Sequence, residues 1–286
     1  DVESRGLGDV YKRQVYTNVT EHVKIGDAPA DFQRLAPSFT VSLQPWQEQL
    51  LFLRLMYKST FRMPTFNDLY YYRLGNRSLR PEKANEYNMG ITWSRSFSSF
   101  LNYLSVTVDG YYNDVTDKIV AFPTTYAWKM ANYGKVHVTG MDATLAAAAS
   151  LGKNTVLVVS GGYTWQKAID LTDATSKSYK DQLPYTPKHS GNVSAVLEMP
   201  WVNVGYSIVG VSERYSMSQN IPENRIDGYM EHTVSLSRNF SFRHCKLRLQ
   251  AEIINLTDTQ YDVIKYYPMP GRSWRLTGTI EFLSLI

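Results

Sequence analysis

The chain has 286 residues, of which 43% are hydrophobic and 20% are charged, and its formal net charge is +4. This length allows one large domain or two ordinary ones. The small charge and the lack of a basic run argue against nucleic-acid binding. Tyrosine occurs 21 times and tryptophan 6 times. Because such amphipathic aromatics gather at interfaces, the composition favours a membrane or a carbohydrate-binding surface.

The single cysteine, Cys245, excludes an internal disulfide and fits either a reducing compartment or simple avoidance of cysteine. No apolar run reaches the roughly 18 residues of a membrane helix. The longest, Ala143 to Leu151, is much shorter. If this chain crosses a membrane, we expect a β-barrel, because a barrel is the other backbone arrangement that satisfies its own hydrogen bonds in lipid.

Residues 1–14 (DVESRGLGDVYKRQ) have neither strand alternation nor the pattern of a signal peptide. The end of this segment, Asp9 to Gln14, resembles the translation of a transposon-derived sequencing adapter. We therefore expect residues 1–14 to be non-native and the fold to begin at residue 15. A disordered natural terminus is the alternative interpretation.

A polar stretch crowded with tyrosine, arginine, asparagine and proline begins at Phe61 and changes at Glu86 into strict alternation. Because successive side chains of a strand face opposite sides, this pattern predicts a strand with one apolar face. The same period of two recurs in residues 101–113, 202–208, 245–253 and 274–282. In the first of these strands the apolar face carries Tyr87, Met89, Ile91 and Trp93, and the polar face carries Glu86, Asn88 and Thr92.

The connections between the predicted strands alternate between short and long. An outer-membrane barrel has short periplasmic turns at one rim and long extracellular loops at the other, whereas a soluble sandwich has no reason to sort its loops. The pattern therefore predicts an all-β, transmembrane antiparallel β-barrel of roughly eleven or twelve strands. Short turns are expected near Pro45–Gln49, Phe97–Leu101, Leu151–Asn154, Met199–Trp201 and Asn239–Cys245, and long loops at Phe61–Lys83, Asp114–Gly134, Lys167–Lys188, Tyr215–Gly228 and Leu256–Arg272.

Two segments fit this pattern poorly. The parity of the apolar residues slips around Gly140, where we expect a β-bulge. Ala146 to Ala149 favour a helix by intrinsic propensity.

Several short motifs follow one another along residues 34–282. They are FRMPTFNDLY (Phe61–Tyr70), LRPEK (Leu79–Lys83), YND (Tyr112–Asp114), TGMD (Thr139–Asp142), LPYTPKH (Leu183–His189), NLTD (Asn255–Asp258) and YPMPGRS (Tyr267–Ser273). In this order, the set resembles the barrel of TonB-dependent outer-membrane receptors. The resemblance implies a 22-strand barrel with a plugged lumen, of which residues 15–286 are the C-terminal portion, without the plug domain.

The resemblance also implies a function and a location. The family resides in the bacterial outer membrane and imports scarce, bulky nutrients such as siderophores or other metal chelates, cobalamin, haem or oligosaccharides. The implied partners are outer-membrane lipid, the plug and the N-terminal half of the barrel, the TonB complex through that N-terminal part, and possibly a surface lipoprotein, with no nucleic acid. A passive outer-membrane pore, an adhesion barrel and a soluble all-β carbohydrate-binding domain are the alternatives.

Aromatic residues on the long loops are the candidates for ligand contact, because they can stack on a ring while an arginine pairs with an anionic group. The alternative is that rim tyrosines form an aromatic girdle. Charged residues on the polar face of the last strands are expected to face the lumen, because they are too costly in lipid. The loop candidates are Tyr70, Tyr71, Tyr72, Arg73, Tyr126, Trp128, Tyr266 and Tyr267, and the lumen candidates are Lys246, Arg248, Glu252, Arg275 and Glu281.

No residue pattern indicates catalysis. The five histidines have no metal-ligand spacing such as H-E-x-x-H. His244 and Cys245 are adjacent, but neighbouring strand residues face opposite sides. We therefore expect neither an enzyme nor a metal site, and no cofactor.

Overall fold

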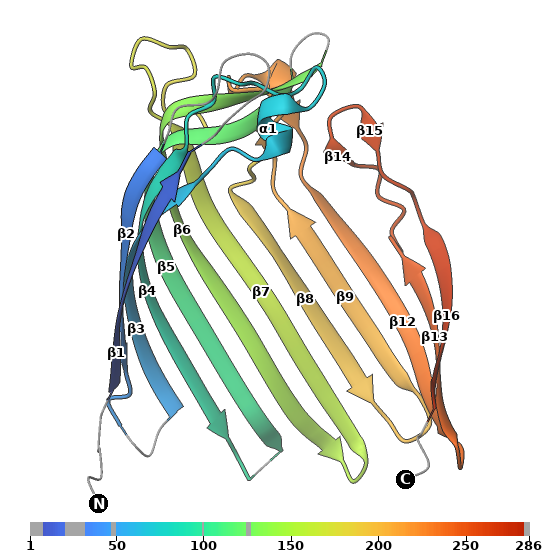
Figure 1. Cartoon of the computed structure of the whole chain (residues 1–286). Helices are drawn as coiled ribbons and strands as arrows, with labels where there is room; N and C mark the ends of the chain where they lie inside the picture. Colours follow the sequence, from blue (N-terminus) through green and yellow to red (C-terminus); the bar gives the residue numbers. More distant parts are fainter. Residues whose placement is uncertain (1–7, 21–31, 47–49, 99, 124–126, 283–286) are drawn as a thin grey trace, which may run out of the picture.

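The computed structural model describes residues 8–20, 32–46, 50–98, 100–123 and 127–282. Twelve strands form one antiparallel sheet in chain order, and Figure 1 shows them side by side with the loops gathered above. The predicted fold class and number of strands are confirmed. The strands are β1 (Gly8–Val19), β2 (Phe32–Leu43), β3 (Leu50–Arg62), β4 (Glu82–Ser96), β5 (Leu101–Pro123), β6 (Trp128–Gly152), β7 (Thr155–Asp170), β8 (His189–Glu198), β9 (Asn203–Val211), β12 (Tyr229–Ser241), β13 (Cys245–Ile254) and β16 (Ser273–Phe282).

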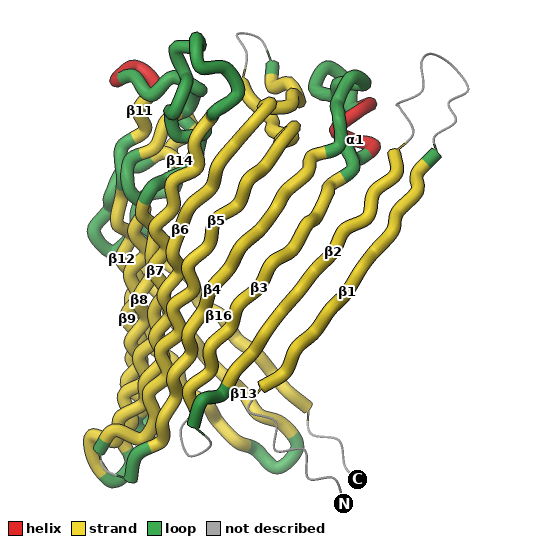
Figure 2. The backbone as a smooth tube through the Cα atoms, turned by 90° about the vertical axis from the view of Figure 1, so that its left-hand side faces the viewer, coloured by secondary structure: helices red, strands yellow, loops and turns green. Residues whose placement is uncertain are grey.

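The sheet curves into an open half-barrel (Figure 2). Within the described residues, β1 pairs only with β2 and β16 pairs only with β13, so each leaves one edge free. Among these residues no helix is long and apolar enough to cross a bilayer.

Short and long connections alternate as predicted except between β5 and β6, where only residues 124–127 connect the strands. They define two rims, which we call the short-turn rim and the long-loop rim. One predicted loop is wrong. Residues 114–134 do not form a loop, because β5 and β6 continue to pair up to Pro123 and Trp128. The β5–β6 hairpin therefore extends past its neighbours into the long-loop rim.

Three further expectations differ from the structure. Strand β1 begins at Gly8, so residues 8–14 pair with β2 although they lack strand alternation. The origin of residues 1–14 stays a prediction.

The predicted β-bulge at Gly140 is absent, because the register of β6 with β5 and β7 has no shift there. Gly140 instead makes room for the ring of Tyr111, since a Cβ on Gly140 would lie 2.3 Å from the Tyr111 Cζ. Ala146 to Ala149 belong to β6, because pairing on both sides outweighs helix propensity.

The cross-strand register assigns each side chain to the outward or the inward face. Tyr87 is in register with Tyr57 and Tyr112 on the outward face, where Met89 is 68% exposed. The packed interior lies at the long-loop rim, where loops fold onto the inward face. One cluster comprises Ala84, Val115, Val136, Ala168 and Leu183, and the other comprises Leu69, Leu79, Ile119 and Met130.

Candidate functional site

The first long loop, between β3 and β4, contains the short helix α1 (Phe66–Tyr70). Thr65 caps this helix by accepting from the Asp68 backbone N–H at 3.2 Å, and the Asp68 carboxylate accepts from the Thr65 N–H at 2.8 Å. Such a capping box satisfies two backbone donors reciprocally. Arg62 holds the same carboxylate at 3.1 Å, so the helix start is tied to the end of β3.

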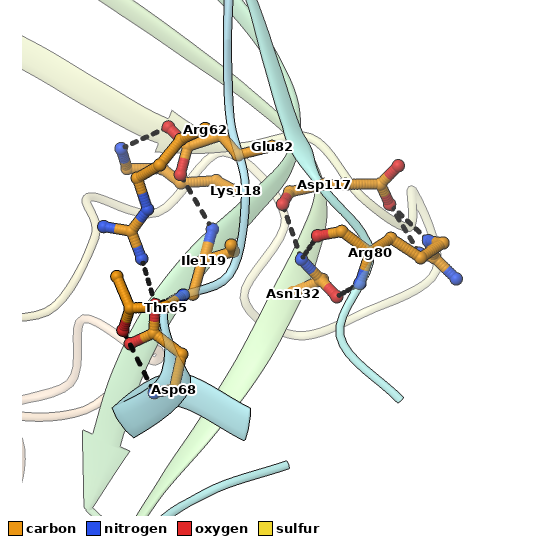
Figure 3. Close-up of polar contacts among 9 residues, drawn as sticks. All are labelled: Arg62, Thr65, Asp68, Arg80, Glu82, Asp117, Lys118, Ile119 and Asn132. Atoms are coloured by element: carbon orange, nitrogen blue, oxygen red, sulfur yellow. Dashed lines mark hydrogen bonds and ion pairs between the residues drawn. The ribbon is translucent and has the colours of Figure 1, made fainter. Parts of the chain in front are cut away.

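The rest of this loop is fastened to the extended β5–β6 hairpin, as Figure 3 shows. The Glu82 carboxylate accepts from the backbone N–H of Ile119 at 3.0 Å and lies 3.6 Å from the Lys118 ammonium. Arg80 donates through Nε to Asp117 at 2.8 Å. The Asn132 amide donates to the carbonyls of Arg80 and Asp117 at 3.0 and 2.6 Å.

The later long loops interlock in the same way. Asn220, in the loop between β9 and β12, accepts from the backbone N–H of Gln182 at 2.8 Å and donates to its carbonyl at 3.0 Å. Arg214 of the short strand β10 (Arg214–Tyr215) donates to the carbonyls of Asp262 and Val263. These contacts connect the loops between β7 and β8, between β9 and β12 and between β13 and β16 into one layer. The remaining small elements of this layer are η1 (Pro222–Asn224), β11 (Arg225–Ile226), β14 (Asp262–Ile264) and β15 (Tyr267–Pro268).

A half-buried polar cluster lies where the last two loops meet. The Tyr261 hydroxyl donates to Glu231 at 2.5 Å, and its ring stacks on Tyr229 with centroids 3.9 Å apart. Burial raises the pKa of Tyr261, and the hydrogen bond to Glu231 and that carboxylate's charge raise it further. Beside the cluster a cavity of about 310 Å³ is lined by residues that include Arg225 and Lys265. The sequence analysis did not single out these residues.

The structure separates the predicted tyrosines of the first loop. Tyr70 ends α1 and is partly buried, because it packs against the cluster of Leu69 and its neighbours. Tyr71 and Tyr72 are 59% and 78% exposed. The Arg73 guanidinium lies 5.2 Å from the Tyr72 ring centroid.

Among the other loop candidates, Tyr266 and Tyr267 are also exposed, at 82% and 70%. Trp128 begins β6, and its ring lies 5.9 Å from that of Tyr185, which belongs to the third long loop. Tyr126 lies outside the described residues. Trp128 is 39% exposed, so the most exposed candidates come from the first and last loops.

The inward face of the wall carries a polar row that the sequence analysis missed. The Arg54 guanidinium donates to Asp109 at 2.8 Å across Gly90, where a Cβ would lie 2.0 Å from the Asp109 carboxylate. In the next strands Thr164 donates to Asp142 at 2.7 Å. The sequence signal that could have revealed this row is that Arg54, Asp109 and Asp142 all occupy inward-facing positions of their strands.

The predicted lumen residues lie on one face of β13 and β16. Glu252 and Arg275 pair through two contacts of 2.6 and 3.0 Å. Lys246 is directly opposite Glu281 in the register. Arg248 donates to Gln250 at 3.1 Å. Their role toward a plug stays a prediction.

The described residues include no group of three or more histidine, cysteine, aspartate or glutamate side chains arranged to hold a metal ion. The comparisons with known proteins point instead to a receptor. Residues 8–256 match the family model described as "TonB dependent receptor-like, beta-barrel". The chain belongs to this family. Its members are outer-membrane β-barrel receptors and transporters of Gram-negative bacteria, not enzymes.

Two relatives are vitamin B12 transporters named BtuB. The chain is 26% identical over 230 residues to the protein of Photobacterium profundum and 24% identical over 233 residues to that of Vibrio vulnificus. These matches cover 78% of this chain but only 34% and 33% of those proteins. The chain thus spans about a third of the length of these relatives.

Solved structures show the same fold. The ferric-catecholate receptor Fiu of Escherichia coli K12 superposes with a TM-score of 0.64 at 20% identity, covering 88% of this chain and 35% of Fiu. The copper transporter OprC superposes with a TM-score of 0.68 at 14% identity, covering 89% of this chain and 40% of OprC.

Proposed function

We propose that this chain forms the C-terminal part of the barrel of an outer-membrane transporter. The complete protein binds a scarce, bulky nutrient at the long-loop rim and imports it with energy supplied through TonB. The nutrient class comprises siderophores and other metal chelates, cobalamin, haem and oligosaccharides. In this proposal the partners are outer-membrane lipid, the plug domain, the N-terminal half of the barrel, the TonB complex and a surface lipoprotein.

The observation that carries this proposal is the arrangement of the long-loop rim. Its loops fold onto the inward face and are fastened to one another, while the rings of Tyr71, Tyr72, Tyr266 and Tyr267 stay exposed. Aromatic rings on a rigid frame provide contact area for a large ligand at a low entropic cost. The cobalamin, catecholate and copper transporters similar to this chain are consistent with such a cargo.

Two other functions compete with this one. A passive pore or an adhesion barrel uses the same wall but does not depend on TonB. A soluble carbohydrate-binding domain is not supported, because the chain belongs to a family of membrane barrels.

The test is uptake by cells that carry the intact gene product and lack other receptors for each ligand. We expect one class among labelled ferric siderophores, cobalamin, haem and oligosaccharides to accumulate, and the accumulation to cease without the TonB complex. Uptake that continues without TonB would establish a passive pore.

The double variant Tyr71→Ala with Tyr72→Ala tests the rim itself. We expect ligand binding to weaken about tenfold or more, since each ring contact contributes about 0.5–1.5 kcal/mol. Trp201→Ala is the matched control, because this exposed ring lies at the short-turn rim. Equal binding by the double variant and the control would contradict the assignment of the first loop.

A further inference from the structure

An apolar groove of about 420 Å³ lies on the outward face of the wall, across strands β7, β8, β9 and β12. One cross-strand row forms its centre, with Tyr163 in register with Gly191, Gly191 with Gly210, and Gly210 with Met230. The two glycines form the floor, and the tyrosine and methionine stand on either side. The next row toward the short-turn rim adds Val193, which is 53% exposed.

The two floor glycines are present for different reasons. A Cβ on Gly191 would lie 2.8 Å from the Gly162 carbonyl oxygen, so the backbone packing there requires glycine. A Cβ on Gly210 would meet its nearest atom, Met230 Cγ, at 3.7 Å, which is an ordinary contact. Glycine within a strand is otherwise unfavourable. Gly210 therefore keeps the groove open without being needed by the fold.

The end of the groove nearest the long-loop rim is polar, and a lysine lies beyond it. The Tyr163 hydroxyl lies 2.7 Å from His189 Nδ1. When the hydroxyl donates to Nδ1, the histidine proton is on Nε2, which becomes a free donor. Lys167 is exposed and lies four residues beyond Tyr163 on the same face of β7, about 13 Å along the strand. The described residues that line the groove include no acidic side chain.

A second outward groove, at Gly110, shows why the first one is distinctive. It also lies beside a tyrosine–histidine pair, Tyr112 and His137. There the Asp114 carboxylate lies 3.2 Å from His137 Nε2. An anion is disfavoured beside that carboxylate, whereas no such carboxylate lines the groove at Gly210.

We propose that the groove at Gly210 binds a lipid with a phosphate headgroup from the leaflet on the long-loop side. One acyl chain lies on the glycine floor between Tyr163 and Met230. The phosphate accepts a hydrogen bond from His189 and pairs with Lys167. The apolar outward face of a membrane barrel continues from the groove toward the short-turn rim, so an acyl chain reaches it without leaving the hydrocarbon layer.

The test uses the intact gene product, purified in a mild detergent and stripped of lipid. Phosphatidylglycerol or diacylglycerol with identical acyl chains is then added, and retained lipid is measured by native mass spectrometry. We expect the unmodified protein to retain phosphatidylglycerol over diacylglycerol, because diacylglycerol lacks the phosphate. Gly210→Leu fills the floor and should lower retention of phosphatidylglycerol about tenfold. Gly278→Leu is the control, because this outward glycine also accepts a Cβ, 3.7 Å from Leu249 Cδ2, and lines neither groove.

Lys167→Glu tests the headgroup site with a change at an exposed position that leaves the wall intact. We expect it to lower retention of phosphatidylglycerol several-fold and to leave diacylglycerol, which has no phosphate, unchanged. Equal retention by the unmodified protein, Gly210→Leu and Gly278→Leu would overturn the groove. Equal loss of both lipids in Lys167→Glu, or no loss, would overturn the headgroup contact.

Discussion

The long-loop rim and the wall of the half-barrel are built from the same strands but bury their side chains in different ways. Both buried apolar clusters lie at the rim, where Leu69, Leu79 and Leu183 from the loops cover inward side chains of the strands. In the wall, outward residues such as Met89 and Val193 stay exposed within this chain. The rim therefore has a core of its own, whereas the wall depends on lipid to cover its outward face.

Removing a rim core side chain should have the largest effect on stability. Leu183 is 5% exposed, and we expect Leu183→Ala to lower the free energy of unfolding by about 2–5 kcal/mol, because it loses apolar contacts and leaves a cavity. Ile221→Ala, at a 41% exposed position in the next long loop, should cost about 0.5 kcal/mol. Urea unfolding of the intact gene product in lipid bilayers measures both. Equal losses would show that the rim has no separate core.

Releasing the first loop from the β5–β6 hairpin should have an intermediate effect. Asn132→Ala removes the side chain that donates to two carbonyls and accepts from the Arg80 N–H. We expect local opening to become easier by about 1–3 kcal/mol. Hydrogen exchange of residues 63–81 should accelerate about tenfold or more, while that of the wall strands stays constant. Asn154→Ala, at an exposed position on the short-turn rim, is the control and should leave these rates unchanged.

The smallest effect is confined to alkaline pH. The pKa of Tyr261 is raised by burial and by Glu231, so the fold favours the neutral phenol. Its contribution to stability is complete below the ordinary pKa of about 10 and is lost as the pH rises through the raised value. An absorbance titration of tyrosinate should contain a late component whose amplitude Tyr261→Phe lowers and Tyr266→Phe leaves unchanged. An unchanged amplitude in Tyr261→Phe would contradict the assignment.

Strand pattern alone predicted much of the wall. The alternation from Tyr87 to Trp93 assigned the two faces of β4, because a strand has a fixed period of two. The parity of charged residues also placed Glu252 and Arg275 on one face, where the structure pairs them. The sorting of loops by length predicted two different rims.

The extent of the β5–β6 hairpin and the structure of the first loop were not predictable in the same way. Ile119 and Met130 become buried because Leu69 and Leu79 pack on them from a distant part of the sequence. Tyr70 is a ligand candidate by residue type, and that same packing leaves its ring partly buried. Residues 8–14 join β1 through backbone pairing, which depends little on side-chain pattern.

The sequence by itself determined the antiparallel wall, the outward and inward faces and the order of short and long connections outside the β5–β6 hairpin, because these follow from local periodicity and loop length. Only the tertiary structure decided which rim side chains are buried, which tyrosines remain exposed and where the outward face is hollowed. Those properties arise from contacts between loops and strands that are far apart along the chain, and from the register that brings Gly191 beside Gly210.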